Sequence, residues 1–207
     1  GHALEILLLL FAIKRDVPSA IHVQRGNHED VQCSLHFGFR AEMQSKFGHH
    51  GGLLWNLCGN LVFPWMPLAT VVGGILTHRR KFCVLHGGVP VGCQGQAGPV
   101  GIDEEISQLD RRRPTVHVTQ DRHGQILFNM LWSDPVETRE GKKANSNGRG
   151  NRFLYEDTQA FCERNGLAFV VRSHEVPQTL RGAHEMHQGK CYTVFSASNY
   201  MGSTGNK

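Results

Sequence analysis

Short apolar segments that each run into a polar loop are the most constraining feature of this sequence. Four segments have the apolar and β-branched character of buried strands, and each ends at a loop rich in polar residues: 20–24, 82–85, 168–171 and 192–195. This recurrence predicts an α/β fold, in which the loops at strand ends converge on one crevice where ligands bind. We therefore expect the functional side chains in these four loops.

Three further patterns predict helices. Residues 4–13 form the longest apolar run, which we interpret as a buried helix because a bilayer span needs about 20 apolar residues. Residues 34–47 carry apolar side chains at four-residue spacing, and residues 155–165 begin with acidic residues and are followed by Gly166. Two stretches rich in glycine or polar residues are expected to be loops, residues 91–100 and 138–150.

Composition excludes several classes of protein. Lys and Arg number 22 against 18 Asp and Glu, and the net charge of +4 is spread over short clusters, so nucleic-acid binding is not indicated. Six separated cysteines without a secretory signal favour reduced thiols in an intracellular protein, cytoplasmic or nuclear. No segment is long enough to span a membrane. No linker or repeat divides the sequence, and we expect residues 1–207 to form one domain.

The loops after the expected strands carry donors suited to a transition metal. Asn27 offers a carbonyl oxygen and His28 an imidazole, His86 precedes two glycines that allow close approach, and His174 follows a strand. Imidazole with carboxamide or carboxylate oxygen suits Zn, Fe or Mn, and a metal pair can hold both oxygens of an in-line phosphoryl displacement. Each motif alone is a weak signal, because an Asn-His-Glu turn is as easily closed by its own side-chain hydrogen bonds.

Taken together and in order, the motifs resemble those of the phosphoprotein phosphatase family, the calcineurin-like metal-dependent Ser/Thr phosphatases. The motifs are Gly-Asn-His-Glu at 26–29, His-Gly-Gly at 86–88, Leu-Trp-Ser-Asp-Pro at 131–135, Arg-Ser-His-Glu at 172–175 and Phe-Ser-Ala-Ser-Asn-Tyr at 195–200. The resemblance implies an α/β metallophosphoesterase sandwich of two mixed sheets flanked by helices. It also implies hydrolysis of phosphoserine and phosphothreonine on proteins by a metal-bound hydroxide.

The same resemblance implies roles for particular residues. Asn27, His86 and His174 are implied to ligate the second of two metals, which would be Mn, Fe or Zn. His28 is implied to be the general acid. Arg149, together with Asn27, is implied to bind the substrate phosphate, a task that suits a planar guanidinium. Two further residues are expected to line the cleft, Tyr200 and Asp134.

Two other motifs of that family, GDxHG and GDxVDRG, are absent from this sequence. In the family they supply the ligands of the first metal, the carboxylate that bridges the metals, the partner of the general acid and a second phosphate-binding arginine. We interpret the sequence as an N-terminally truncated fragment with little activity of its own. Loss of a single stabilising group from a preorganised site typically lowers the rate by about 10²–10³-fold.

Alternative functions stay open at this point. One is a small-molecule phosphoesterase such as a dinucleoside polyphosphate hydrolase, since related enzymes share the ligand set. Another is a pseudophosphatase that acts as a binding module for regulatory subunits. Within the family, Asp30 and Ser198 favour the branch with EF-hand domains, whereas residues 182–193 and 205–207 are closer to the tetratricopeptide-repeat branch.

Several residues in or near the motifs are more simply explained by packing. Trp132 is expected in the core because a buried aromatic ring is first a large apolar packing unit. Glu29 and Glu175 are expected to orient their loops rather than bind metal. His184 and His187 are expected at the surface.

Overall fold

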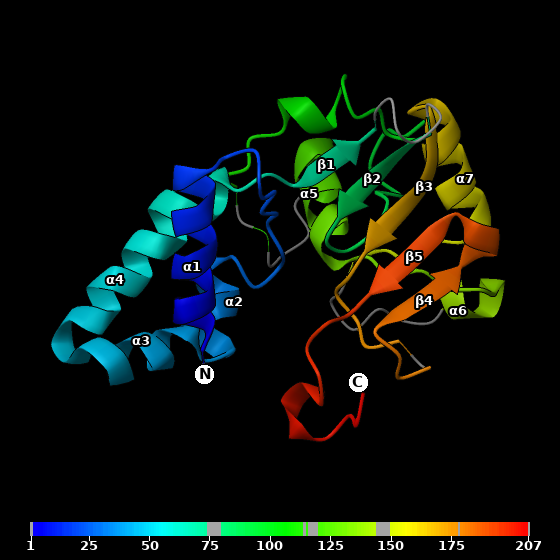
Figure 1. Ribbon diagram of the computed structural model, residues 1–207. Coiled ribbons are helices and arrows are strands. Elements are labelled where there is room, and N and C mark those ends of the chain that lie inside the picture. Colours follow the sequence, from blue (N-terminus) through cyan, green and yellow to red (C-terminus); the bar gives the residue numbers. More distant parts are fainter. Residues whose placement is uncertain are drawn as a thin grey trace.

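The computed structural model describes residues 2–73, 80–113, 115, 120–143, 150–177 and 179–206. Figure 1 shows a group of N-terminal helices on one side and a sheet with further helices on the other. The helices are α1 (Ala3–Asp16), α2 (Val31–His36), α3 (Phe39–Phe47), α4 (Gly51–Leu57), α5 (Arg122–Trp132), α6 (Arg139–Lys143) and α7 (Tyr155–Arg164). The strands are β1 (Ala69–Val72), β2 (Lys81–Leu85), β3 (Leu167–Arg172), β4 (Ala183–Met186) and β5 (Cys191–Val194).

The five strands form one mixed sheet in the order β1-β2-β3-β5-β4. β2, β3 and β5 run parallel, and β1 and β4 pair antiparallel at the two edges. The three central strands therefore end at the same edge of the sheet, where ligands bind in α/β folds. Three of the four strands expected from the sequence are confirmed as β2, β3 and β5, and the α/β class is confirmed with them.

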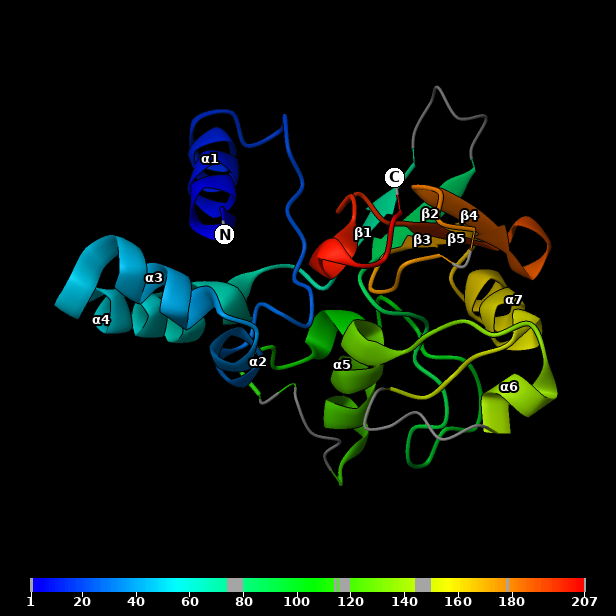
Figure 2. The same cartoon turned by 90° about the horizontal axis from the view of Figure 1, so that it is seen from below.

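Helices α5 and α7 cover one face of this sheet (Figure 2). The sheet contributes five of the buried core residues, Cys83, Leu85, Leu167, Val170 and Cys191. The two helices contribute six, Ile126, Leu127, Met130, Leu131, Phe161 and Cys162. Because apolar burial is the dominant stabilising term, this core fixes the carboxyl ends of β2 and β3 against the end of α5. The loops that follow these elements are thereby brought together.

Helix α1 confirms the helix expected at residues 4–13, but its burial was predicted wrongly. Only Leu4 is buried in this helix, whereas Ile6, Leu8 and Leu9 are 57%, 57% and 61% exposed. Leu4 packs with Met43 of α3 and with other residues in a small apolar cluster separate from the sheet core. The helix contacts α3, and three further apolar side chains, Leu7, Leu10 and Phe11, are partly buried. None of the described helices is both long and apolar enough to cross a bilayer.

Other sequence predictions are corrected by the structure. The strand expected at 20–24 does not form, because a strand needs a neighbouring strand to complete its hydrogen-bond ladder. The backbone N–H of Arg25, which follows this segment, bonds to the carbonyl of Pro67 outside any strand. The described residues contain one sheet rather than the two that were expected. The expected loop at 138–150 includes α6. The single domain over residues 1–207 stays a prediction.

Candidate functional site

Three of the four loops predicted to carry function meet at the carboxyl edge of the sheet. His86 directly follows β2, His174 lies two residues after β3, and Asn27 lies in the turn before α2. Oδ1 of Asn27 and Nε2 of His86 are 2.8 Å apart, and the ring centroids of His86 and His174 are 5.4 Å apart with the rings edge-on. The structure thus brings together the three residues implied as metal ligands.

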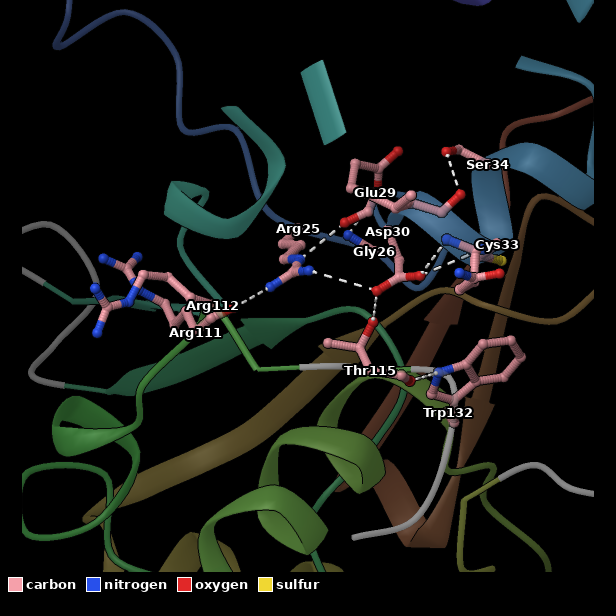
Figure 3. Close-up of polar contacts among 12 residues, drawn as sticks. Arg25, Gly26, Glu29, Asp30, Cys33, Ser34, Arg111, Arg112, Thr115 and Trp132 are labelled. Atoms are coloured by element: carbon pink, nitrogen blue, oxygen red, sulfur yellow. Dashed lines mark hydrogen bonds and ion pairs between the residues drawn. The ribbon is translucent and has the colours of Figure 1, made fainter. Parts of the chain in front are cut away.

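The turn that carries Asn27 and His28 is closed by its own neighbours. The carboxylate of Glu29 accepts the backbone N–H of Gly26 at 2.7 Å, which confirms that Glu29 orients the loop. A side chain at Gly26 would stand 3.0 Å from the ring of His86, so glycine is needed for the turn to approach the histidine. Figure 3 shows Asp30 at the other end of the turn, where its Oδ1 accepts the backbone N–H groups of Gln32 and Cys33 and caps α2.

His174 is fixed by the acidic residue that was expected in the cleft wall. Its Nδ1–H donates to Oδ1 of Asp134 at 2.8 Å, so Nε2 carries the lone pair whenever the ring is neutral. The backbone of His174 has φ +71°, a region that L residues rarely occupy and that clusters at functional sites. The edge of Trp132 packs against the same ring, with centroids 5.8 Å apart, and Trp132 also packs against the core as expected.

Arg172 ties the site loops to one another. Its buried guanidinium donates to the carbonyl oxygens of Gly87 and Ser133, at 2.5 and 3.0 Å, and to Oδ1 of Asp134 at 2.6 Å. It also forms an ion pair of 3.2 Å with Glu175, which confirms that Glu175 acts within the loop structure. The sequence motif contains Arg172, but sequence reasoning gave it no role, because nothing local distinguishes a buried arginine from an exposed one.

Burial and neighbouring charges set the protonation of the site. Burial, followed by the charge of His174, lowers the pKa of His86 from its ordinary 6.5 to about 3. Burial alone would raise the pKa of Asp134, but hydrogen bonding to His174, the charge of His174 and the Arg172 guanidinium hold it well below its ordinary 3.8. An ionised Asp134 and a neutral His86 are the forms required of a hydrogen-bond acceptor and of a metal ligand, respectively.

His28, the implied general acid, lies at the edge of this group. Its half-buried ring packs on Phe37 with centroids 4.5 Å apart, beside a cavity of about 590 Å³ lined also by Leu7 and Phe63. Burial and then the charge of His174 lower the pKa of His28 below 6.5. His28 directly follows Asn27 in the same turn, so it is next to one candidate ligand in the chain.

Not every predicted residue joins the group. Tyr200 lies in a short helical turn near the C-terminal end of the chain, where its ring meets Phe195 at 5.3 Å, and none of its described contacts is with Asn27, His86 or His174. Arg149 lies outside the described residues. His187 was expected at the surface but is buried. Its Nδ1 is hydrogen-bonded to the hydroxyl of Thr158 at 2.8 Å, and its Nε2 to the carbonyl oxygen of Val136 at 3.1 Å.

The donors present fit part of a transition-metal site. Oδ1 of Asn27 and Nε2 of His86, two atoms that can ligate a metal, point toward one another. His174 has its ring oriented by the carboxylate of Asp134, as metal-binding histidines commonly do, and this leaves its Nε2 as the possible ligand atom. Within the described part of the chain, no three His, Cys, Asp or Glu side chains lie together in a way that could hold a metal ion. The group described here has two histidines, and its third donor is the side-chain amide of Asn27. These residues therefore supply a partial coordination sphere.

Comparison with known proteins agrees with this geometry. Residues 2–178 match the calcineurin-like phosphoesterase family. Serine/threonine-protein phosphatase T of Aspergillus oryzae is 35% identical over 205 residues, which are 98% of this chain and 38% of that protein. Serine/threonine-protein phosphatase 5 of Homo sapiens is 32% identical over 205 residues, 99% of this chain and 36% of that protein. The chain thus spans well under half the length of these curated relatives.

A solved structure extends the agreement to three dimensions. It is a protein serine/threonine phosphatase from Saccharomyces cerevisiae with similarity to human phosphatase PP5, and it matches with a TM-score of 0.76 and 28% identity over 98% of this chain and 56% of that one. The metallophosphoesterase fold implied by the motifs is confirmed, and members of this class are dinuclear metal enzymes. Since the match covers residues 2–178, the chain belongs to the calcineurin-like phosphoesterase family.

Proposed function

We propose that this protein is a metal-dependent Ser/Thr phosphatase that hydrolyses phosphoserine and phosphothreonine on proteins. The observation that carries the proposal is the convergence of Asn27, His86 and His174, with Asp134 orienting His174. The names of the relatives support a protein substrate.

Relatives named phosphatase T and phosphatase 5 also favour the tetratricopeptide-repeat branch over the EF-hand branch. We further propose an intracellular protein, cytoplasmic or nuclear, whose partners are phosphoproteins and regulatory subunits or domains.

Each residue of the group has a task in this reaction. Asn27, His86 and His174 would hold one metal, with Mn, Fe and Zn all suited to such donors. A bound metal would supply Lewis acidity at the phosphoryl group. Asp134 keeps the proton of His174 on Nδ1, so that Nε2 faces the site. His28 protonates the departing Ser or Thr oxygen, and Arg149 binds the phosphate oxygens.

The test measures turnover and bound Mn²⁺ in the same preparations, with the protein expressed from its complete coding sequence. His28→Asn is expected to lower kcat for a phosphothreonine peptide by about 10²–10⁴-fold and to leave Mn²⁺ content unchanged, because only proton transfer is removed. His86→Ala and His174→Ala are expected to lower Mn²⁺ content. The exposed His49 provides a control, since His49→Ala should change neither quantity.

The outcomes separate the proposal from its alternatives. Hydrolysis of a dinucleoside polyphosphate without hydrolysis of the phosphopeptide would identify a small-molecule phosphoesterase. Failure to hydrolyse either substrate would identify a pseudophosphatase that serves as a binding module. An unchanged rate in His28→Asn would remove His28 from the mechanism.

A further inference from the structure

Asp30 carries out two tasks with one buried carboxylate. Its Oδ1 caps α2, and its Oδ2 accepts the hydroxyl of Thr115 at 2.7 Å, although 85 residues separate the two in sequence. Both side chains are buried, Thr115 completely. Figure 3 shows Thr115 below Asp30, on the side of the turn away from Ser34. The turn that bears Asn27 and His28 is therefore anchored to a residue far along the chain.

Thr115 also contacts the opposite side of the candidate site. Its backbone carbonyl accepts the indole N–H of Trp132 at 2.6 Å, as Figure 3 also shows. Trp132 in turn packs edge-on against His174. One residue thus connects the turn with His28 to the aromatic ring that supports His174.

Arg25 cannot replace the Thr115 hydroxyl. Its Nη2 is 4.0 Å from Oδ2 of Asp30, beyond hydrogen-bond distance. Its Nε and Nη1 donate instead to the carbonyl oxygens of Glu29, at 2.9 Å, and Arg111, at 2.5 Å. Removal of the hydroxyl would leave a buried carboxylate oxygen without its hydrogen-bond donor, and such groups are costly to leave unpaired.

We propose that Asp30 and Thr115 form a positioning link, which sets the turn of Asn27 and His28 at a fixed place relative to Trp132 and His174. Neither residue touches the reacting atoms. The link positions the metal-binding residues of the proposed function. Its effect on catalysis therefore rests on that proposed function. It would keep the carbonyl oxygen of Asn27 directed at His86.

Three variants of the protein, expressed from its complete coding sequence, test the link. Thr115→Val removes the hydroxyl at almost constant volume, and Thr115→Ser retains it. Ser34→Ala is the matched control, because the buried hydroxyl of Ser34 in α2 accepts the indole N–H of Trp55 at 2.9 Å and donates to the carbonyl of Val31 at 3.1 Å, and neither bond is to the 26–29 turn. It removes two hydrogen bonds of a buried hydroxyl in the same region.

Two measurements are made on each variant, amide hydrogen exchange in the peptide covering residues 24–33 and the affinity for Co²⁺ from its visible absorption. Thr115→Val is expected to speed exchange in this peptide by about tenfold, the ratio that corresponds to one lost buried hydrogen bond. It is also expected to weaken Co²⁺ binding severalfold. Thr115→Ser should retain wild-type values in both measurements, and Ser34→Ala should retain the wild-type affinity for Co²⁺.

The two measurements keep this inference apart from the proposed function. Wild-type exchange and Co²⁺ affinity in Thr115→Val would overturn the link, and so would an equal loss of Co²⁺ affinity in Ser34→Ala, which would indicate general destabilisation. If the wild-type protein, expressed from its complete coding sequence, binds no Co²⁺, the metal-dependent function fails. In that case the exchange rates of the Val and Ser variants alone decide whether Thr115 holds the turn.

Discussion

The side chain of Arg172 is fully buried where the loops after β2, α5 and β3 meet. Its donors reach Gly87, Ser133 and Asp134, so that one residue satisfies acceptors on segments 39 and 85 residues away. A buried charge is stable only when it is paired and hydrogen-bonded, and Arg172 meets both conditions. The orientation of Asp134, and through it of His174, depends on this guanidinium.

Replacement of Arg172 by methionine tests this dependence. We expect Arg172→Met to lower the free energy of unfolding by about 3–5 kcal/mol, because the carboxylate of Asp134 stays buried without its cation. Arg164 offers a control, since its 3.1 Å ion pair with Glu104 is largely exposed and Arg164→Met should cost less than about 1 kcal/mol. Urea unfolding of both variants gives the comparison, and equal losses would contradict the role of Arg172.

His187 predicts how stability depends on pH. Burial lowers its pKa below 6.5, against the opposing effects of the Val136 carbonyl and nearby carboxylates. Below pH 6.5 the unfolded chain therefore binds a proton at this position that the folded chain does not, and stability falls as the pH falls. His187→Asn suits the positive φ of this position and cannot titrate in this range.

We expect urea unfolding between pH 7.5 and 5.5 to show a smaller loss of stability in His187→Asn than in the wild type. The variant will itself be less stable at pH 7.5, because the bonds to Thr158 and Val136 are lost. The slope with pH is therefore the informative quantity. Parallel slopes for the two proteins would exclude His187 as a source of the pH dependence.

At the scale of elements, the boundary between α2 and α3 depends on one glycine. Apolar residues at four-residue spacing predicted one helix over 34–47, but the chain forms two helices and turns at Gly38, which has φ +90°. A left-handed residue ends a helix, and glycine adopts this conformation without the steric cost that other residues have. The break lets α2 lie beside the turn of Asn27 and His28, while α3 packs against α1.

Gly38→Ala is expected to destabilise the fold by about 1–2 kcal/mol, the cost of a left-handed conformation for an L residue. No atom lies within 4 Å of the added methyl group, so the cost is conformational rather than steric. Gly52 of α4 is the matched control. Its added methyl also meets open space, and Gly52→Ala should stabilise the protein by about 0.4–1 kcal/mol. Thermal unfolding of the two variants should give shifts of opposite sign, and shifts of the same sign would contradict this account.

At the scale of the whole molecule, two separate apolar clusters stabilise the structure unequally. The larger one joins the sheet to α5 and α7, and the smaller one joins α1, α3 and α4 around Leu4, Met43 and Trp55. The large core lies beneath the loops that carry His86 and His174. The small cluster leaves much of α1 exposed.

Truncation of one leucine in each environment measures this inequality. Leu127→Ala removes a completely buried side chain from the large core and should lower the free energy of unfolding by about 2–5 kcal/mol. Leu9→Ala removes a side chain that is 61% exposed, and the change should stay within about 0.5 kcal/mol of zero. A large loss in Leu9→Ala would indicate that the outer face of α1 is covered in solution.

Much of the candidate site could be predicted from the sequence, because its chemistry belongs to residue types in short motifs at strand ends. His86 and His174 follow parallel strands, which bring their ends to one edge whatever their separation in sequence. Asn27 was identified from its polar turn, although the segment before it forms no strand, and Asp134 was expected from the resemblance to the phosphatase motifs. The strands β2, β3 and β5 and the helix α7 were predictable for a similar reason. Their periodicity and end signals are local.

Only the tertiary structure decided which buried partner each polar group has. The links of Arg172 to Gly87, of Asp30 to Thr115 and of His187 to Val136 each join segments at least 50 residues apart. Likewise, the exposure of α1 and the missing partner of residues 21–24 depend on what packs beside them. Hydrogen-bond partners and burial are properties of the packed chain, whereas donor chemistry and local periodicity are already present in the sequence.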